Sequence, residues 1–102
     1  MTNRDLRYAY KYYNRKFFGG VLPPATVKFR RMPKRHCSLG VTYKEDREIN
    51  INWELRNWMT IAHSTLLHEM VHMFLPARYT HGPIFQRAML HLATQGAFEK
   101  LW

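Results

Sequence analysis

Apolar side chains recur every three or four positions near the start of the chain, which is the period of a helix with one buried face. We predict a helix over residues 3–18. Its apolar face holds Leu6, Ala9, Tyr10, Tyr13 and Phe17. The pair Gly19-Gly20 is expected to end this helix, and the two prolines after Leu22 force an extended connection.

Three short segments that follow alternate apolar and polar side chains, which is the period of a half-buried strand. They cover residues 26–31, 39–43 and 49–52. The polar run at 45–47 predicts a hairpin turn between the second and third strands. A three-stranded sheet is therefore expected.

The segment 61–75 is apolar nearly all round, which is typical of a central helix buried on most sides. Pro76 should end this helix. Pro83 suits the first turn of a final helix that runs to about Gly96. The order of elements predicts a single compact α+β domain.

Length and composition favour a small intracellular domain. A chain of 102 residues has room for one hydrophobic core. Cys37 is the only cysteine, so no intramolecular disulfide framework is possible. No apolar run approaches the roughly 20 residues of a membrane helix, and the polar N-terminus does not resemble a signal peptide. We therefore expect a cytoplasmic protein. We also expect a monomer, because no heptad pattern or long exposed strand edge is evident.

The buried segment contains the motif His68-Glu69-Met70-Val71-His72. Residues four apart on a helix lie about one turn apart on the same face, so the imidazoles of His68 and His72 can bind one metal ion. Glu69 lies to the side and can take a proton from a water that zinc acidifies, then pass it to a leaving amine. The motif indicates a zinc-dependent hydrolase of the peptidase type.

A catalytic zinc ion usually has three protein ligands, and His81 is the best candidate for the third. The turn expected after Pro76 can return the chain to the ion. No glutamate is placed to do so, since Glu99 is the only acidic residue after Glu69. Phe85 is expected to pack under the site.

Two alternative interpretations of the motif involve no catalysis. His68 and His72 could be hydrogen-bonded core residues with Glu69 at the surface, although polar groups in so apolar a segment need a partner. A purely structural zinc site would lack a fourth ligand and leave Glu69 without a role. We expect structural or surface roles for the other histidines, which are His36, His63 and His91.

The motif at 68–72, followed by His81-Gly82-Pro83-Ile84-Phe85, resembles the SprT-like metallopeptidase domain, whose family includes the Spartan DNA-protein crosslink protease. The segment from Tyr13 to Pro23 is similar to the opening helix of that family and the turn after it. The resemblance implies one zincin-like SprT-like domain over residues 1–102. It also implies one catalytic Zn²⁺ ion held by His68, His72 and His81, with Glu69 as the catalytic base.

The same resemblance implies a DNA-linked protease that removes proteins bound or crosslinked to DNA. Many members of the family carry a C-terminal zinc ribbon with paired cysteines, whereas this chain has only Cys37. The chain therefore resembles a minimal form of the domain.

Charge gives the second strong signal. Sixteen Lys and Arg against seven Asp and Glu give a formal net charge of +9, which favours a polyanionic partner. One basic stripe follows the first helix, and a second group follows the first strand and the loop after it. The candidate nucleic-acid-binding residues are Arg4, Arg7, Lys11, Arg15, Lys28, Arg30, Arg31, Lys34 and Arg35. The alternative is that these side chains only keep the surface solvated.

Exposed aromatic side chains could add stacking to these charges. Tyr8, Tyr12, Trp53 and Trp58 are candidates to stack on unpaired bases. Packing in the core or at its rim is the commoner role of such residues.

We therefore expect a zinc-dependent, DNA-dependent endopeptidase that acts on proteins bound or crosslinked to single-stranded or junction DNA. A substrate strand would pair with an exposed sheet edge and present its carbonyl group to zinc. Tyr79 and Tyr43 are candidates to stabilise the oxyanion. Two alternative functions are a non-catalytic DNA-binding module with a structural or vestigial metal site, and a general small metallopeptidase unrelated to DNA.

Overall fold

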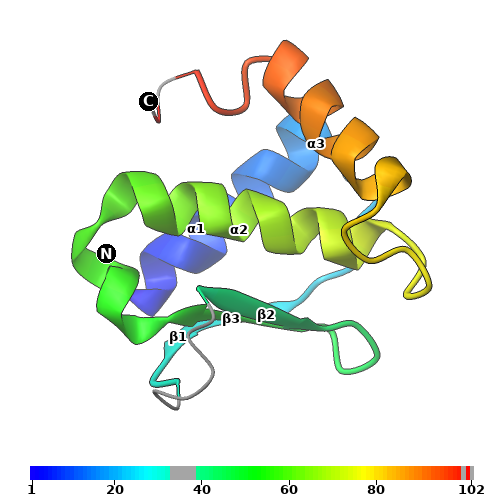
Figure 1. The fold of residues 1–102 in the computed structure, drawn as a ribbon. Coiled ribbons are helices and arrows are strands. Elements are labelled where there is room, and N and C mark those ends of the chain that lie inside the picture. The colour runs from blue at the N-terminus through cyan, green and yellow to red at the C-terminus, as the bar shows by residue number, and fades with distance from the viewer. Residues whose placement is uncertain (33–38, 100, 102) are drawn as a thin grey trace.

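Helices α1 and α2 lie over one face of a small mixed sheet, and α3 packs against α2 (Figure 1). The computed structural model describes residues 1–32, 39–99 and 101. Within these residues the elements are α1 (Asn3–Phe17), β1 (Thr26–Arg30), β2 (Gly40–Tyr43), β3 (Glu48–Asn52), the 3₁₀ helix η2 (Trp53–Asn57), α2 (Met59–Phe74) and α3 (Pro83–Thr94). The predicted α+β fold and the order of its main elements are confirmed, and η2 is an addition.

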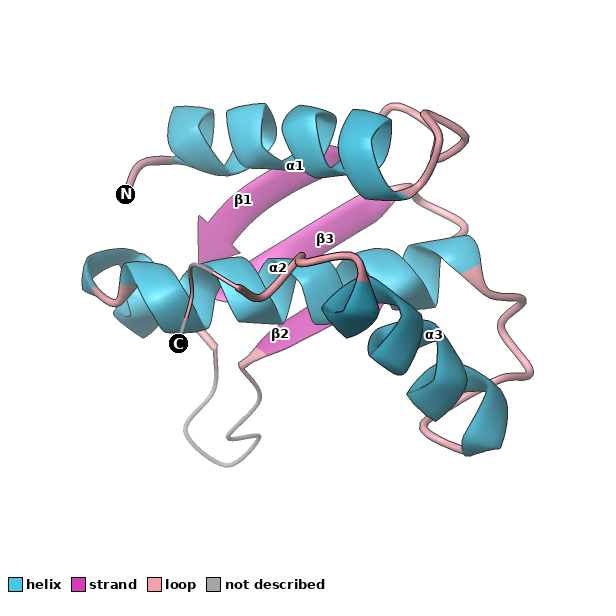
Figure 2. Ribbon diagram, turned by 90° about the horizontal axis from the view of Figure 1, so that it is seen from above, coloured by secondary structure: helices cyan, strands magenta, loops and turns pink. Residues whose placement is uncertain are grey.

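The sheet has the strand order β1-β3-β2, so β3 is central and β2 forms one edge. β1 pairs with β3 in parallel, and β2 pairs with β3 antiparallel through the predicted hairpin. Ile49 and Ile51 of β3 are fully buried in the core, because alternate side chains of a strand share one face. Viewed from above, α1 covers β1 while α2 crosses β3 and β2 (Figure 2).

Asn50 of β3 is fully buried as well, which alternation along the strand does not predict. Its Nδ2 atom donates to Glu48 Oε2 at 3.3 Å. In the part of the chain that the structure describes, its Oδ1 atom has no hydrogen-bond partner.

Helix α1 is anchored at both ends. Thr2 and Asp5 form a capping box at its start, each accepting a hydrogen bond from the backbone N–H of the other. Gly19 and Gly20 adopt positive φ after its end, as the pair predicts. The side chain of Asn14 then pairs with both the N–H and the carbonyl of Leu22, which holds the extended connection to β1 against the helix.

Helix α2 is the centre of the core. Eight of its residues are buried, and they come from most sides of the helix, as the apolar sequence predicts. The helix ends at Phe74, because Leu75 precedes a proline and takes an extended conformation. Helix α3 then begins with Pro83 at its first turn, which leaves His81 directly before its start.

Candidate metal centre

The side chains of His68, His72 and His81 converge on one point. Their Nε2 atoms lie 3.2 Å (His68 to His81), 3.3 Å (His68 to His72) and 3.0 Å (His72 to His81) apart. Two nitrogen ligands of a tetrahedral zinc ion lie about 3.3–3.4 Å apart, because each Zn–N bond is about 2.0–2.1 Å long. The spacing therefore fits three ligands of one ion.

Local chain geometry produces this convergence. His68 and His72 are one helical turn apart on α2. Beyond the end of α2, a turn in which Tyr79 N–H donates to Pro76 O brings the chain back towards the helix. The side chain of Gln86 in α3 then donates to the His81 carbonyl at 3.2 Å, which ties His81 to the helix it precedes.

Phe85 packs under the site, as predicted. The centroid of its buried ring lies 4.8, 4.5 and 5.0 Å from the centroids of the imidazole rings of His68, His72 and His81. A rigid aromatic surface on the same side of all three rings limits their rotation. The histidines are thus oriented before any ion binds.

Protonation also favours metal binding. Burial lowers the pKa of His72 to about 4 and lowers that of His68, and the neighbouring imidazoles add to both shifts. Both rings are therefore neutral at pH 7. A neutral imidazole offers either one hydrogen or one lone pair at Nε2, so three adjacent Nε2 atoms cannot all hydrogen-bond to one another. A cation facing the three lone pairs removes this conflict.

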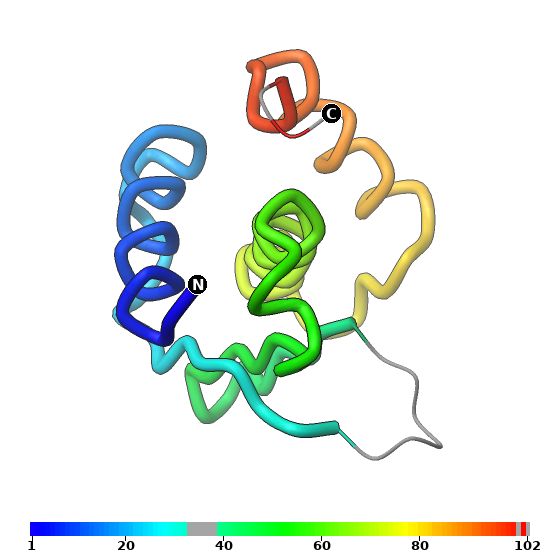
Figure 3. Tube along the Cα trace, turned by 90° about the vertical axis from the view of Figure 1, so that its left-hand side faces the viewer, coloured from blue at the N-terminus to red at the C-terminus, as the bar shows by residue number. Residues whose placement is uncertain are grey.

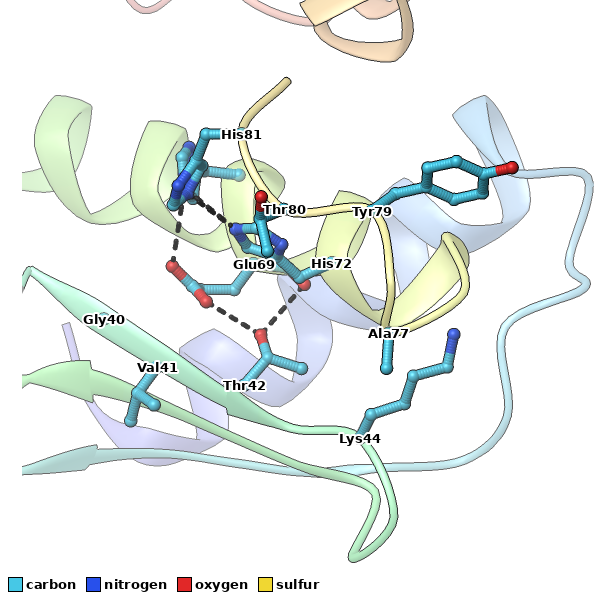
Figure 4. Close-up of a pocket in the computed structure, with 11 residues that line it drawn as sticks. Gly40, Val41, Thr42, Lys44, Glu69, His72, Ala77, Tyr79, Thr80 and His81 are labelled. Carbon is cyan, nitrogen blue, oxygen red and sulfur yellow. Dashed lines mark hydrogen bonds and ion pairs between the residues drawn. The ribbon is translucent and has the colours of Figure 1, made fainter. Parts of the chain in front are cut away.

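Glu69 is beside the histidines and is not part of their cluster. Its side chain is only 7% exposed, and its Oε2 atom lies 3.9 Å from His68 Nε2. Burial raises the pKa of this carboxyl group, while a hydrogen bond from Thr42 opposes the shift. The structure thus places a buried carboxyl group beside the histidine cluster (Figure 4).

Thr42 of β2 fixes the orientation of Glu69. Its hydroxyl group lies 2.8 Å from Glu69 Oε1 and 3.0 Å from the Glu69 backbone oxygen. With Oε1 held in this way, Oε2 turns towards the histidines (Figure 4). Alternation with Val41 and Tyr43 on the second predicted strand was the only sequence signal for Thr42, and it does not reveal a contact with α2.

Gly40 is the second residue of β2 whose role the sequence did not reveal. A Cβ atom there would lie 2.9 Å from Thr65 Cγ2 and 3.2 Å from Glu69 Cγ. The missing side chain therefore allows β2 to approach α2 closely enough for the Thr42 contact. A glycine inside a strand is itself a sign of close approach.

A cleft passes the histidine cluster. A cavity of about 430 Å³ lies between β2 and the segment 77–81, with Lys44 at its far end (Figure 4). The Lys44 amino group donates to the carbonyl of Leu75, which joins the end of β2 to the end of α2. A second cavity of about 870 Å³ continues from the cluster in the other direction. Its walls are mostly apolar and include Ile61, Met89 and Phe98.

Neither proposed oxyanion residue is placed for that role. Tyr79 lines the first cavity, but its ring points away from the histidines (Figure 4) and its hydroxyl group accepts a hydrogen bond from Arg78 at 3.2 Å. Tyr43 lines neither cavity of the cleft, because it alternates with Thr42 along β2. The prediction for these two residues was wrong.

The other histidines lie apart from the cluster. His63 Nδ1 is 2.8 Å from the Tyr13 hydroxyl, and His91 Nε2 is 3.0 Å from Gln95 Nε2. Structural and surface roles are thus confirmed for these two. His36 is outside the described residues.

The basic residues divide into two groups. Arg4, Arg7, Lys11 and Arg15 are exposed along α1 and form what we call the α1 stripe. The second group is less available for phosphate contacts. The Lys28 amino group pairs with Glu48 Oε1 at 3.4 Å, and the Arg31 guanidinium carbon lies 4.2 Å from the Trp53 ring centroid. Arg30 is exposed, whereas Lys34 and Arg35 lie outside the described residues.

A family model described as the SprT-like family matches residues 6–100. No curated protein and no solved structure matches the chain. Among the described residues, no helix has the length and apolar character that a membrane span requires.

We expect wild-type protein to bind one zinc ion, and His72→Ala and His81→Ala to lose that binding. Zinc at a free concentration of 100 times its Kd should raise the unfolding free energy of the wild type by about 2.7 kcal/mol. Elemental analysis and thermal unfolding with and without a chelator measure both effects. His91→Ala is the matched control and should behave as wild type. Full zinc occupancy of His81→Ala would contradict the assignment.

Thr42→Val should raise the pKa of Glu69, because it removes the hydrogen bond that lowers it. A hydrogen bond to a charged group contributes about 1.5–3 kcal/mol, so stability should fall by about that amount at pH 7. The loss should shrink at acidic pH, where Glu69 is protonated and accepts a weaker bond. Carbon NMR titration of the Glu69 carboxyl group in metal-free protein gives the pKa. Thr42→Ser keeps the hydroxyl group and should match wild type; an unchanged pKa in Thr42→Val would rule out the contact.

Proposed function

Because this chain belongs to the SprT-like family, a metallopeptidase-like family, we propose that it is a zinc-dependent endopeptidase that cleaves proteins bound or crosslinked to DNA. One observation carries the proposal. A buried carboxylate lies 3.9 Å from one of three imidazoles whose nitrogen atoms have the spacing of zinc ligands. Such a combination matches the needs of amide hydrolysis, where a carbonyl must be polarised and a proton must be moved.

His68, His72 and His81 would hold the ion through their Nε2 atoms. Three protein ligands leave a position for water or substrate, which is the pattern of catalytic zinc sites. Zinc bound there would supply Lewis acidity, which polarises a carbonyl group and lowers the pKa of water.

Glu69 would act as the general base and then as the general acid. Its Oε2 atom accepts a proton from the attacking water and delivers that proton to the amine that leaves. Thr42 holds Oε1 at 2.8 Å, so the carboxylate keeps one orientation during both transfers. Burial of Glu69 excludes other water molecules from this exchange.

Within the described residues β2 pairs on one side only, with β3, and its other edge supports a site for an extended peptide. Leu39 accepts a hydrogen bond from Asn52 on β3, and hydrogen-bonded residues alternate along an antiparallel strand. The peptide groups of Gly40 and Thr42 therefore face away from β3, towards the cleft. A substrate strand can pair with these groups and lie across the histidine cluster.

An antiparallel substrate would run from the Lys44 end of β2 to the Leu39 end. The residue that follows the scissile bond would then lie towards the apolar cavity, near Ile61, Met89 and Phe98. Main-chain pairing carries little sequence information, so we propose a broad substrate range with a preference for an apolar side chain at that one position.

The α1 stripe supports the nucleic-acid part of the proposal. Four exposed basic side chains on one helix, in a chain of net charge +9, are suited to phosphate contacts. Binding of DNA by this surface would concentrate the enzyme on proteins attached to single-stranded or junction DNA. Selectivity would then come from DNA proximity rather than from peptide sequence.

We expect zinc-loaded wild type to cleave a basic DNA-binding protein in the presence of single-stranded DNA. Glu69→Gln should cleave it about 10²–10⁴-fold more slowly than wild type. Gel analysis of the cleaved protein gives the rates, and zinc content measured in the same samples should be equal. Cleavage by Glu69→Gln at the wild-type rate would refute the role of Glu69.

The same assay tests the alternatives. Full-rate cleavage without DNA would indicate a general metallopeptidase, whereas DNA binding by a zinc-loaded wild type that cleaves nothing would indicate a binding module.

Reversing charge on the α1 stripe should remove the DNA stimulation while leaving zinc content unchanged. In Arg7→Glu with Lys11→Glu, the dependence of log Kd on log salt concentration should weaken by about 0.7 for each phosphate that the protein no longer neutralises. Titration of a labelled oligonucleotide at several salt concentrations gives this slope. Arg47→Glu with Arg87→Glu changes the net charge equally at exposed residues elsewhere. If both double variants lose the same stimulation, the effect is one of total charge and not of this surface.

A further inference from the structure

A third cavity, apart from the two that form the cleft, lies between α1 and the first turns of α2. It has a volume of about 540 Å³, within the range of about 300–1,000 Å³ that small-molecule sites span. Its lining includes Tyr8, Tyr12 and Tyr13 of α1 and Met59 and His63 of α2. We call it the tyrosine cavity.

The tyrosine cavity is separate from the peptide cleft. His63 and His68 are five residues apart, which places them about 140° apart around α2. α1 and α3 accordingly lie on different sides of α2, seen as the blue and orange helices of Figure 3. A ligand in the tyrosine cavity and a peptide in the cleft would therefore not compete for space.

Position around α1 links the tyrosine cavity to the α1 stripe. At about 100° per residue, Tyr8 and Tyr12 lie between the stripe and the side of α1 that faces α2. Tyr8 is one turn from both Arg4 and Lys11, and the residue is 75% exposed. A chain whose phosphates follow the stripe would thus bring its other groups over these two rings.

The interior of the tyrosine cavity suits a flat ring with polar edges. Aromatic side chains and Met59 supply apolar faces. Polar atoms are present at the Tyr13–His63 contact of 2.8 Å and at Asp5, whose Oδ2 atom already accepts the Thr2 N–H. Burial lowers the pKa of His63, so its ring is neutral at pH 7 and does not attract phosphate into the cavity.

We infer that the tyrosine cavity binds an unpaired base of a single-stranded nucleic acid whose phosphates lie along the α1 stripe. The inference rests on the proposed function and deepens it, because it gives one base of the single strand a site on the enzyme. Charge complementarity favours a polyanion over a peptide here, since the exposed Arg4 and Lys11 lie one turn from Tyr8 and the exposed Arg15 lies one turn from Tyr12. Single strands are selected because bases inside a duplex stack on one another and do not expose their faces to a tyrosine.

Binding of three labelled strands of equal length tests the inference: oligothymidine, an abasic strand with the same phosphates, and a duplex. The protein carries Glu69→Gln, so proteolysis does not disturb the measurement. Stacking contributes about 1–3 kcal/mol per base, so oligothymidine should bind about 5- to 150-fold more tightly than the abasic strand. Equal affinity for the two strands would overturn the inference.

Tyr8→Ala should remove most of this difference by weakening oligothymidine binding alone. Tyr8→Phe keeps the ring and should retain the difference. Tyr43→Ala removes an exposed tyrosine on the sheet and serves as the control. A full difference in Tyr8→Ala, or duplex bound as tightly as oligothymidine, would also overturn the inference.

The outcome is independent of the protease assignment. Failure of the binding test would leave Glu69-dependent cleavage intact, and failure of cleavage would leave the preference for bases intact.

Discussion

Helix α2 sets the constraint on which the rest of the structure depends, since it is buried on most sides and still carries two imidazoles and a carboxylate. Unpaired polar groups in such a helix are costly. The fold meets this constraint with elements from both directions along the chain: β2 provides the Thr42 hydroxyl group for Glu69, and the segment after Pro76 brings His81 to the other two histidines. Phe85 then closes the space under the three rings. The three Nε2 atoms still face one another, and a cation bound between them would satisfy their lone pairs.

The same helix separates the two kinds of ligand that we propose. Its side towards β2 and α3 carries the histidine cluster and the proposed peptide cleft, while its side towards α1 carries His63 and the tyrosine cavity. A nucleic acid held along α1 would leave the cleft open to a protein attached to that nucleic acid. A requirement for DNA would then follow from co-localisation, with no conformational change needed in the core.

The sequence was sufficient to predict the elements, because helix and strand periods, the Gly19-Gly20 pair and the prolines are local signals. The three candidate metal-binding histidines were predictable for the same reason, since His68 and His72 share a helical face and Pro83 places His81 at a helix start. The strand order and the parallel pairing of β1 with β3 were not, because alternation shows which side chains point inward and not which strands are neighbours. The roles of Thr42 and Gly40 were missed because they depend on how closely β2 approaches α2, which the alternation of side chains does not show.

The central claim is that the three histidines hold one catalytic metal ion, and the X-ray absorption spectrum of the zinc-loaded protein tests it most directly. We predict three imidazole ligands and one lighter oxygen ligand, with Zn–N distances of about 2.0–2.1 Å and multiple-scattering features that count the histidines. A sulfur ligand at about 2.3 Å, which only Cys37 or a methionine could provide, or fewer than three imidazoles, would contradict it.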